Sequence, residues 1–243
     1  MRYKVVLSYD GNEYVGFQSQ KNGVAIQDVI EDVIYKIFSE RTRIIMSSRT
    51  DSGVHAKYQV IHFDASKKID PYRLKGFFNG LLPKTIHVSD VKIVSEKFHA
   101  RFNVKTKTYE YLINNGEYDV FLNGYAYQCN YHLDIELMKK CAKLFIGKHD
   151  FTSFNTTPLS EKENQTRTIT KFDVTKKKGI IKITVTGDGF LKNMVRIMVG
   201  CLVDVARGQK EIRDIKEMLK NPSKDYKKYN IDANGLYLVK IRY

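Results

Sequence analysis

The sequence predicts an α+β protein made of two halves, each with the element order β-α-β-β-α-β. Strand-like alternation and helix-like spacing of apolar residues follow one another in that order twice along the chain. Apolar residues make up 42% of the 243 residues, which is enough for a packed core. Two split β-α-β units in tandem are consistent with two α+β halves whose sheets join. We place the halves at residues 1–104 and 105–243.

The first half begins with a strand in which Val5, Leu7 and Tyr9 share one face. Apolar residues at helical spacing then predict the first helix, and Asp70-Pro71 is a good start for the second, because Asp caps a helix and Pro suits its first position. The expected elements are strands at 3–9, 43–46, 58–64 and 87–94 and helices at 26–38 and 71–81.

The second half repeats this order after a long irregular segment. Asp134 caps its first helix and Gly147 ends it. Two of its strands are joined by Lys176-Lys177-Lys178-Gly179, which reads as an exposed hairpin tip. The expected elements are strands at 107–113, 168–174, 180–186 and 236–242 and helices at 135–146, 192–206 and 211–219.

The charge balance favours a polyanionic partner. Lys and Arg number 41 against 27 Asp and Glu, a net charge of +14. Residues 1–105 carry 17 basic and 11 acidic groups, or +6, which leaves +8 for the remainder. Both halves are therefore basic, as expected of a surface that meets nucleic acid along its length. The alternative is a solvated basic surface that serves only solubility.

Several classes of protein are disfavoured. The three cysteines, Cys129, Cys141 and Cys201, are widely spaced and form no C-x-x-C pair, so neither a disulfide scaffold nor a zinc site is expected. The six histidines show no metal-ligand spacing. The N-terminus reads as a strand rather than a signal peptide, and no apolar run has the length of a membrane helix. We expect a soluble cytoplasmic protein without a metal.

The strongest chemical candidate is the segment 48–56, Ser-Arg-Thr-Asp-Ser-Gly-Val-His-Ala. Its carboxylate, Asp51, lies between two hydroxyl side chains, with Arg49 two residues before it and Gly53 two residues after it. The segment runs directly into an expected strand. A carboxylate on a tight loop beside a strand is placed like a nucleophile or a general base.

The second half offers three candidates to meet Asp51 in a cleft. Tyr109 and Tyr111 share one strand face, although ordinary aromatic core packing explains them equally well. Arg196 stands on an otherwise apolar helix, where a charged side chain either snorkels or pairs. Asp51 and Asp204 are both possible partners for it. On the loop after the first strand, Tyr14, Phe17 and Gln18 either stack and read a base or seal the core.

Taken together, these residues resemble the bacterial tRNA pseudouridine synthases of the TruA type, over nearly the full length. Two departures are visible: Ser48 stands where the family usually has glycine, and Phe17 replaces a more common tryptophan. The matching segments are Tyr9-Asp10-Gly11, Gly16-Phe17-Gln18, residues 49–56, 59–63, 98–102, Tyr109-Glu110-Tyr111, residues 150–154, Phe190-Leu191, residues 193–196, Gly200 and residues 235–239.

The resemblance implies the pseudouridine synthase fold: two ferredoxin-like halves with a joined, mainly antiparallel sheet and a central basic cleft. It also implies isomerisation of uridine to pseudouridine, by default in the anticodon stem-loop of tRNA at positions 38 to 40. Asp51 would be the catalytic carboxylate. Tyr109 would stack on the target base and Arg196 would pair with Asp51 and keep it ionised. No group is added and nothing is oxidised, so neither cofactor nor metal is expected.

The family binds tRNA across two subunits, which implies a homodimer. Arg49 matches an arginine that helps to hold the target nucleotide out of its stack. Ribosomal RNA is the rival substrate, a non-catalytic RNA-binding protein is a second alternative, and a hydrolase using Asp51 is a third that lacks an obvious second carboxylate. The further RNA contacts that we predict are Tyr14, Gln18, His55, Arg101 and Lys192.

Overall fold

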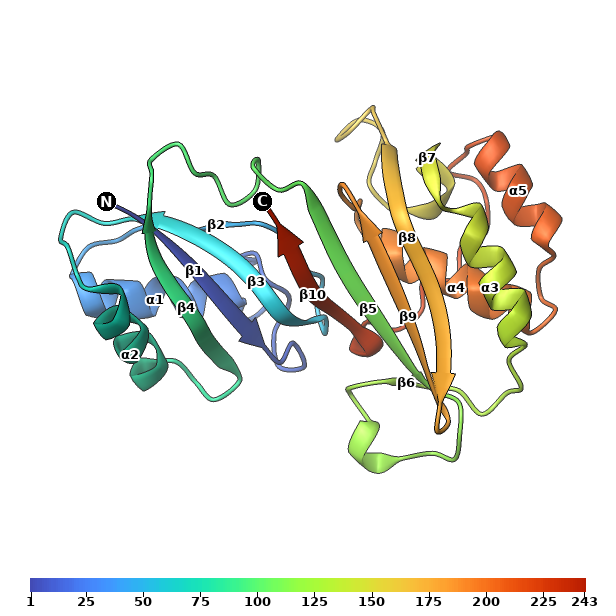
Figure 1. Cartoon of the computed structure of the whole chain (residues 1–243), viewed down its shortest axis with the longest axis horizontal. Helices are drawn as coiled ribbons and strands as arrows, with labels where there is room; N and C mark the ends of the chain where they lie inside the picture. Colours follow the sequence, from blue (N-terminus) through green and yellow to red (C-terminus); the bar gives the residue numbers. More distant parts are fainter. The chain divides into compact units, whose positions relative to one another are not determined.

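The computed structural model describes residues 1–243 and divides into two compact units (Figure 1). The first unit comprises Met1–Lys105 and Tyr237–Tyr243, and the second comprises Thr106–Leu236. The last strand, which we assigned to the second half, therefore lies with the first unit. Each unit contains helices packed on a mostly antiparallel sheet, so the predicted α+β class is confirmed.

The sheet of the first unit has β1 and β3 at its centre. All of its pairings are antiparallel except that of the chain's last strand with β3. In that parallel pairing Tyr237 lies opposite His55, at the end of β3 that follows the Asp51 loop. The strand order is β4 (Ile86–Val94), β1 (Arg2–Tyr9), β3 (His55–Asp64) and β10 (Leu236–Arg242), with β2 (Ile45–Met46) also paired to β3.

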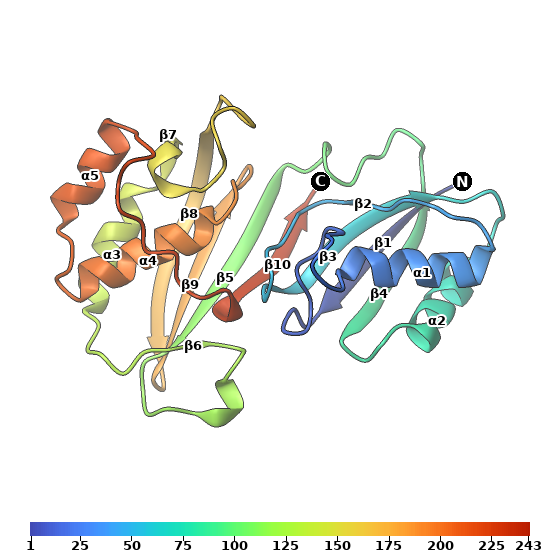
Figure 2. The ribbon, with the colours of Figure 1, turned by 180° about the vertical axis from the view of Figure 1, so that it is seen from behind.

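Two helices, α1 (Ile26–Phe38) and α2 (Pro71–Leu81), cover one face of this sheet; Figure 2 shows α1 in front of β1 and β3. Asp70 caps α2 as expected, since its carboxylate accepts from the backbone amides of Tyr72 and Arg73. The core beneath the helices is aromatic. Phe63 on β3 packs against Tyr3, Phe38 and Phe78 with ring centroids 5.4 to 6.2 Å apart.

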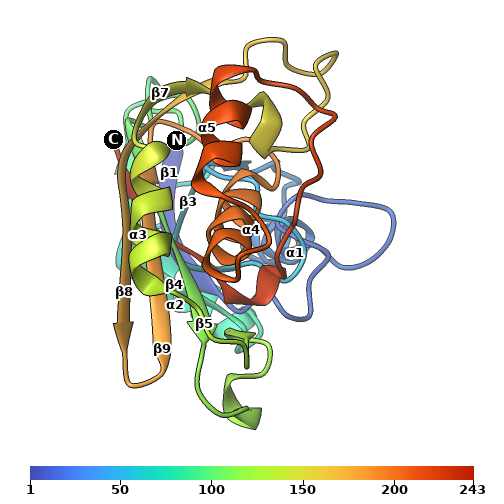
Figure 3. The ribbon, with the colours of Figure 1, turned by 90° about the vertical axis from the view of Figure 1, so that its right-hand side faces the viewer.

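In the sheet of the second unit four strands pair antiparallel and a short fifth strand pairs parallel with the first of them, and the helices α3, α4 and α5 lie on one side of β8 and β9 (Figure 3). Nearly every residue of α4 is buried, which explains its apolar sequence. The strand order is β5 (Thr106–Asn114), β9 (Ile180–Gly187), β8 (Thr166–Lys177) and β7 (Gly147–Asp150), with β6 (Tyr127–Gln128) paired to β5; the helices are α3 (Ile135–Leu144), α4 (Met194–Ala206) and α5 (Ile212–Lys220).

Several boundaries differ from those expected; β8, for example, spans Thr166–Lys177 rather than residues 168–174. The strand β3 starts at His55 rather than at residue 58, so it reaches almost to the Asp51 loop. Gly147 does not merely end a helix but opens β7, which the sequence reading missed. The helix α4 starts at Met194 rather than at residue 192, because Asn193 has a left-handed backbone.

The chain has neither a helix suited to cross a membrane nor a cluster of metal-binding side chains. No helix combines the length and the apolar character that crossing a membrane requires. No group of three His, Cys, Asp or Glu side chains is arranged to hold a metal ion.

Candidate active site

The Asp51 loop is fixed on both sides of its carboxylate. The hydroxyl groups of Tyr9 and Thr50 lie 2.7 Å apart in the buried interior. The backbone carbonyl of Thr50 accepts from the amide of Phe17 at 3.1 Å, and that of Asp51 accepts from the amide of Val54 at 3.2 Å. The Asp51 side chain itself is half-buried. The carboxylate is therefore presented on a loop that is held to β1 through the Thr50 side chain, and to Phe17 and within its own turn through backbone bonds.

A buried amide on β3 anchors the entry to this loop. Gln59 Nε2 donates to the carbonyl of Ser48 at 2.8 Å, and its Oε1 accepts from the Ser47 hydroxyl at 2.6 Å. Ser48, which replaces the usual glycine, is not among the residues with positive φ. The serine therefore costs the loop no backbone strain, and its entry does not require glycine.

Three glycines allow the tight turn of the loop and the close approach of the neighbouring backbone. Gly53 has φ +76°, which only glycine adopts readily in a turn. A Cβ on Gly16 would lie 2.9 Å from the carbonyl oxygen of Thr50, and one on Gly11 would lie 2.1 Å from that of Val54. The segment 10–18 and the Asp51 loop thus pack backbone against backbone. This explains why Tyr-Asp-Gly and Gly-Phe-Gln accompany the Asp51 motif, a structural role that the sequence reading did not identify.

We expect Gly11→Ala to destabilise the protein by about 2–3 kcal/mol, because the added methyl group collides with backbone rather than with a flexible side chain. Gly76→Ala is the matched control. Gly76 lies inside α2 with nothing within 4 Å of an added Cβ, so alanine should be neutral or stabilise by up to about 1 kcal/mol. Urea denaturation of both variants measures the difference, and equal stabilities would contradict this account of the loop.

The predicted RNA contacts near Asp51 differ in exposure. Arg49 is exposed and Gln18 is half-buried. Tyr14 is buried, with its hydroxyl 2.7 Å from that of Thr85. His55 is also buried: its Nδ1 accepts from the amide of Gly11 at 3.1 Å, and its ring stacks on Tyr237 at 4.7 Å. Tyr14 and His55 thus help to build the walls of the loop, and contact of any of these four residues with RNA stays a prediction.

Arg101, also in the first unit, lies far from the Asp51 loop along β3. His62, near the opposite end of β3, accepts the amide of Ala100 on its Nδ1 at 3.0 Å. The seven residue-to-residue steps from His55 to His62 correspond to on the order of 20 Å of strand. Arg101 is exposed in the turn that follows, where the exposed Phe102 stacks on His99 with centroids 4.2 Å apart. Any RNA contact by Arg101 would therefore lie outside the immediate surroundings of Asp51.

The two tyrosines of β5 in the second unit have different environments. Tyr109 is buried and packs edge-to-face on Phe190 with centroids 5.1 Å apart. Tyr111 donates its hydroxyl to the carbonyl of Asp232 at 2.6 Å. Burial, reinforced by Asp232, raises the pKa of Tyr111 well above its usual range, so its phenol stays protonated and keeps that bond. Tyr111 is thus a core residue, and Tyr109 is the better candidate for chemistry.

Arg196 occupies the first turn of α4 and is half-buried. Its Nε donates to the carbonyl of Ile231 at 2.7 Å, and its Nη1 donates to Asn193 Oδ1 at 3.0 Å. Asp204, one of the partners considered for it, instead forms an ion pair with Lys210. A cation in the first turn opposes the helix dipole, so helix stability does not explain this arginine. Lys192, just before the helix, is exposed.

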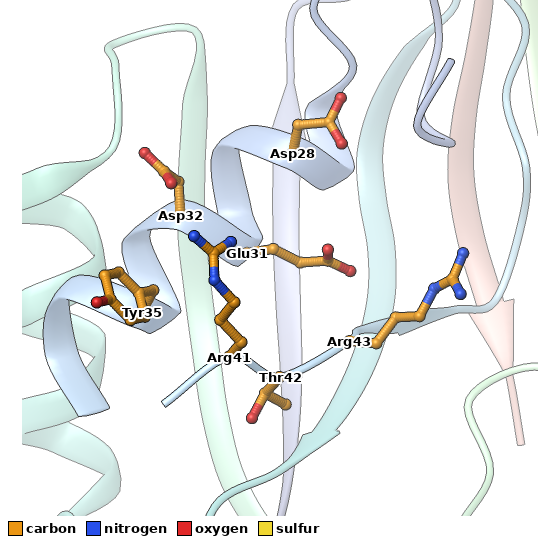
Figure 4. A pocket seen from close by; sticks show the side chains of 7 residues that line it. All are labelled: Asp28, Glu31, Asp32, Tyr35, Arg41, Thr42 and Arg43. Carbon is orange, nitrogen blue, oxygen red and sulfur yellow. The ribbon is translucent and has the colours of Figure 1, made fainter. Parts of the chain in front are cut away.

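A separate pocket of about 410 Å³ lies on the outer side of α1 (Figure 4). Two of its three acidic residues serve the fold. Glu31 Oε1 accepts from the amide of Ile44 at 2.9 Å, and Asp28 caps α1 through the amide of Ala25. Arg41 lies over the ring of Tyr35 at 5.2 Å. The pocket contains none of the predicted site residues.

Comparison with known proteins gives concordant results. A family model described as tRNA pseudouridine synthase matches residues 5–103 and 141–243. The tRNA pseudouridine synthase A of Thermoanaerobacter sp. (strain X514) is 41% identical over 242 residues, with 98% of both chains covered. That of Malacoplasma penetrans is 38% identical over 245 residues, and that of Bacillus licheniformis 39% identical over 246 residues; at least 99% of each chain is covered.

Proposed function

Because the chain belongs to the tRNA pseudouridine synthase family, and is thereby an isomerase that forms pseudouridine in tRNA, we propose that Asp51 performs the reaction. The proposed targets are uridines of the anticodon stem-loop, at positions 38 to 40. The observation that carries the assignment is the held Asp51 loop: its backbone is bonded to Phe17 and Val54, while its carboxylate is half-buried. Such a loop presents one anionic group in a fixed place.

The reaction breaks the C1′–N1 bond of uridine, turns the uracil and joins C5 to C1′; the proton on C5 is released and N1 takes up a proton in its place. An ionised carboxylate serves either of two routes, attack at C1′ or removal of a proton on the way to a glycal. A carboxylate at an anomeric carbon has the role that it has in glycosidases. Uracil must leave its stack to reach Asp51, and the exposed Arg49 beside it is suited to hold the backbone of a flipped nucleotide.

We propose that Tyr109 and Arg196 complete the site, Tyr109 by stacking on the uracil and Arg196 by pairing with Asp51. Their local settings support these roles. Tyr109 presents an aromatic ring already oriented by Phe190, and the Arg196 guanidinium is oriented by two acceptors in its own unit. A bidentate guanidinium is the usual partner of a carboxylate that must stay ionised.

A tritium-release assay tests this function. Bulk tRNA and ribosomal RNA labelled with [5-³H]uridine are incubated with the protein, because joining C5 to C1′ releases the C5 hydrogen to water. We expect release from tRNA and none above background from ribosomal RNA. Tritium release from ribosomal RNA alone would identify ribosomal RNA as the substrate instead of tRNA. Tritium release from neither RNA would support a non-catalytic RNA-binding protein.

We further propose that the protein works as a homodimer, and that the segment 115–131 is where the second copy docks. This segment exposes five large apolar side chains and is nonetheless ordered: Gln128 accepts from Asn114 at 2.7 Å and donates to the carbonyl of Asp119 at 3.1 Å. Figure 1 shows it beyond the end of β5. The exposed side chains are Tyr118, Val120, Phe121, Tyr125 and Tyr131.

The charge of this segment favours a protein over RNA. Residues 115–131 contain two acidic side chains, Glu117 and Asp119, and no Lys or Arg, in a chain of net charge +14. An acidic, apolar surface repels phosphates, and the remaining surface of a second copy is strongly basic and complementary to it. A second copy of this chain is therefore the occupant we propose.

Phe121→Ser should weaken self-association by at least about 30-fold, the effect of losing an aromatic anchor worth about 2 kcal/mol. Phe121 is 87% exposed and Tyr72 on α2 is 86% exposed, so Tyr72→Ser is a matched control that should leave association unchanged. Sedimentation velocity at micromolar protein distinguishes the three proteins. A monomeric wild type, or a Phe121→Ser variant that is as dimeric as wild type, would contradict the proposal.

A further inference from the structure

Asn193 stands at the start of α4 but does not cap the helix. Asparagine is favoured at this position because its side chain normally accepts from the amides of the first turn. In this structure no such bond is made. Its backbone, at φ +59° and ψ 4°, is left-handed rather than extended, and it is one of only three non-glycine residues with positive φ. The residue thus adopts a rare conformation without the usual benefit to the helix.

The side chain is instead used for two other contacts. Asn193 Oδ1 accepts from Arg196 Nη1 at 3.0 Å, and its Nδ2 donates to the hydroxyl of Thr156 at 2.8 Å. The same junction is joined by backbone, since the amide of Thr156 donates to the carbonyl of Lys192 at 3.1 Å. Asn193 therefore connects the guanidinium of Arg196 to the segment that follows Phe154.

The second acceptor of Arg196 is equally well placed. The carbonyl of Ile231 accepts a hydrogen bond from Arg196 Nε, and the carbonyl of the next residue, Asp232, accepts one from the hydroxyl of the buried Tyr111. Gly200 on α4 approaches the same segment so closely that a Cβ would lie 2.0 Å from the carbonyl oxygen of Tyr229. Ile231 and Asn193 thus bind the guanidinium through two different nitrogens and together define its plane.

We propose that Asn193 is a positioning residue for the pseudouridine reaction: it sets the plane in which Arg196 is presented. The proposal rests on the proposed role of Arg196. It explains why the polar contacts of Asn193 are made to an arginine and a threonine rather than to the helix, and why α4 begins with a left-handed residue. The orientation of Arg196 is a functional reason for the local preferences that the junction breaks.

Asn193→Gly removes the side chain while allowing the same backbone. We expect kcat for pseudouridine formation to fall at least about tenfold, as for loss of one hydrogen bond to a charged group, with KM for tRNA within about threefold of wild type. Asn193→Asp keeps both the left-handed backbone and an acceptor for Nη1, and should recover most of the lost kcat. Wild-type kcat in Asn193→Gly would overturn the proposal.

A double-mutant cycle with Arg196→Lys distinguishes positioning from a merely structural role. If Asn193 acts through Arg196, Asn193→Gly should cost little further activity once the guanidinium is gone. If the fold-losses in kcat of the two single variants multiply in the double variant, the proposal is overturned. If Asn193→Gly does not fold, the Asn193→Asp variant decides in its place. A kcat near the wild-type value supports the proposal, and a loss of kcat as large as that of Arg196→Lys overturns it. Absence of activity in wild type would instead remove the proposed function itself.

Discussion

Substituting Asp51 by Asn should lower kcat for pseudouridine formation by at least about 10⁴-fold while the affinity for tRNA stays within about threefold of wild type. Asparagine has the same shape but no charge, so it neither attacks C1′ nor accepts a proton on the glycal route. The loop should keep its conformation, because it is held through backbone atoms and through Thr50 rather than through the carboxylate alone. Tritium release under single-turnover conditions measures kcat, and filter binding measures affinity.

Asp32→Asn is a suitable control for this variant. Asp32 lies on α1 in the same unit, is exposed, and has only a long 3.8 Å contact with Lys36. It should retain full activity. Residual turnover of Asp51→Asn above a few per cent of wild type would rule out Asp51 as the reacting carboxylate, whereas joint loss of activity and tRNA binding would point to a damaged loop.

Replacing Arg196 by Lys should lower kcat about 100-fold. The guanidinium uses Nε for Ile231 and Nη1 for Asn193, and a lysine ammonium cannot reproduce this two-nitrogen fork. Losing one charge-assisted hydrogen bond of about 1.5–3 kcal/mol, and with it the fixed orientation that the proposed pairing with Asp51 requires, accounts for an effect of this size. The measurement is kcat and KM for tRNA, with the melting temperature of each protein.

Arg213→Lys serves as the matched substitution. Arg213 is exposed on α5 and pairs with Glu211 at 2.9 Å, so the change should leave kcat unaltered. Near-normal kcat in Arg196→Lys would remove the proposed partnership with Asp51. A fall in kcat that follows a lower melting temperature would assign Arg196 to the stability of the second unit instead.

The helices were predictable because local rules and packing agree. The apolar spacing of residues 26–38 matches α1, and the Asp70 and Asp134 carboxylates cap α2 and α3 as their positions suggested. Short strands such as β6 and β7 were missed, because two to four residues carry no reliable period. The membership of β10 in the first unit depends on its parallel pairing with β3, in which Tyr237 lies opposite His55, 182 positions earlier; no local pattern encodes this pairing.

The candidate site residues were easier to predict from the sequence than the residues that hold them in place. The resemblance identified Asp51. The need for glycine at position 11 becomes visible only in the structure, where an added Cβ would lie 2.1 Å from the carbonyl oxygen of Val54 in the Asp51 loop. Gln59 reads as a polar residue in a strand, although it is fully buried and anchors Ser48. Asn193 falls inside the helix expected at 192–206, and its left-handed backbone was not predictable from its sequence position.

The most direct test of the central claim is a map of pseudouridine in a tRNA transcript treated with wild-type protein or with Asp51→Asn. Carbodiimide modification followed by reverse transcription locates each pseudouridine. Wild type should produce stops only at uridines among positions 38 to 40, and Asp51→Asn should produce none. Pseudouridine outside the anticodon stem-loop would contradict the proposed target, and equal maps for the two proteins would contradict the role of Asp51.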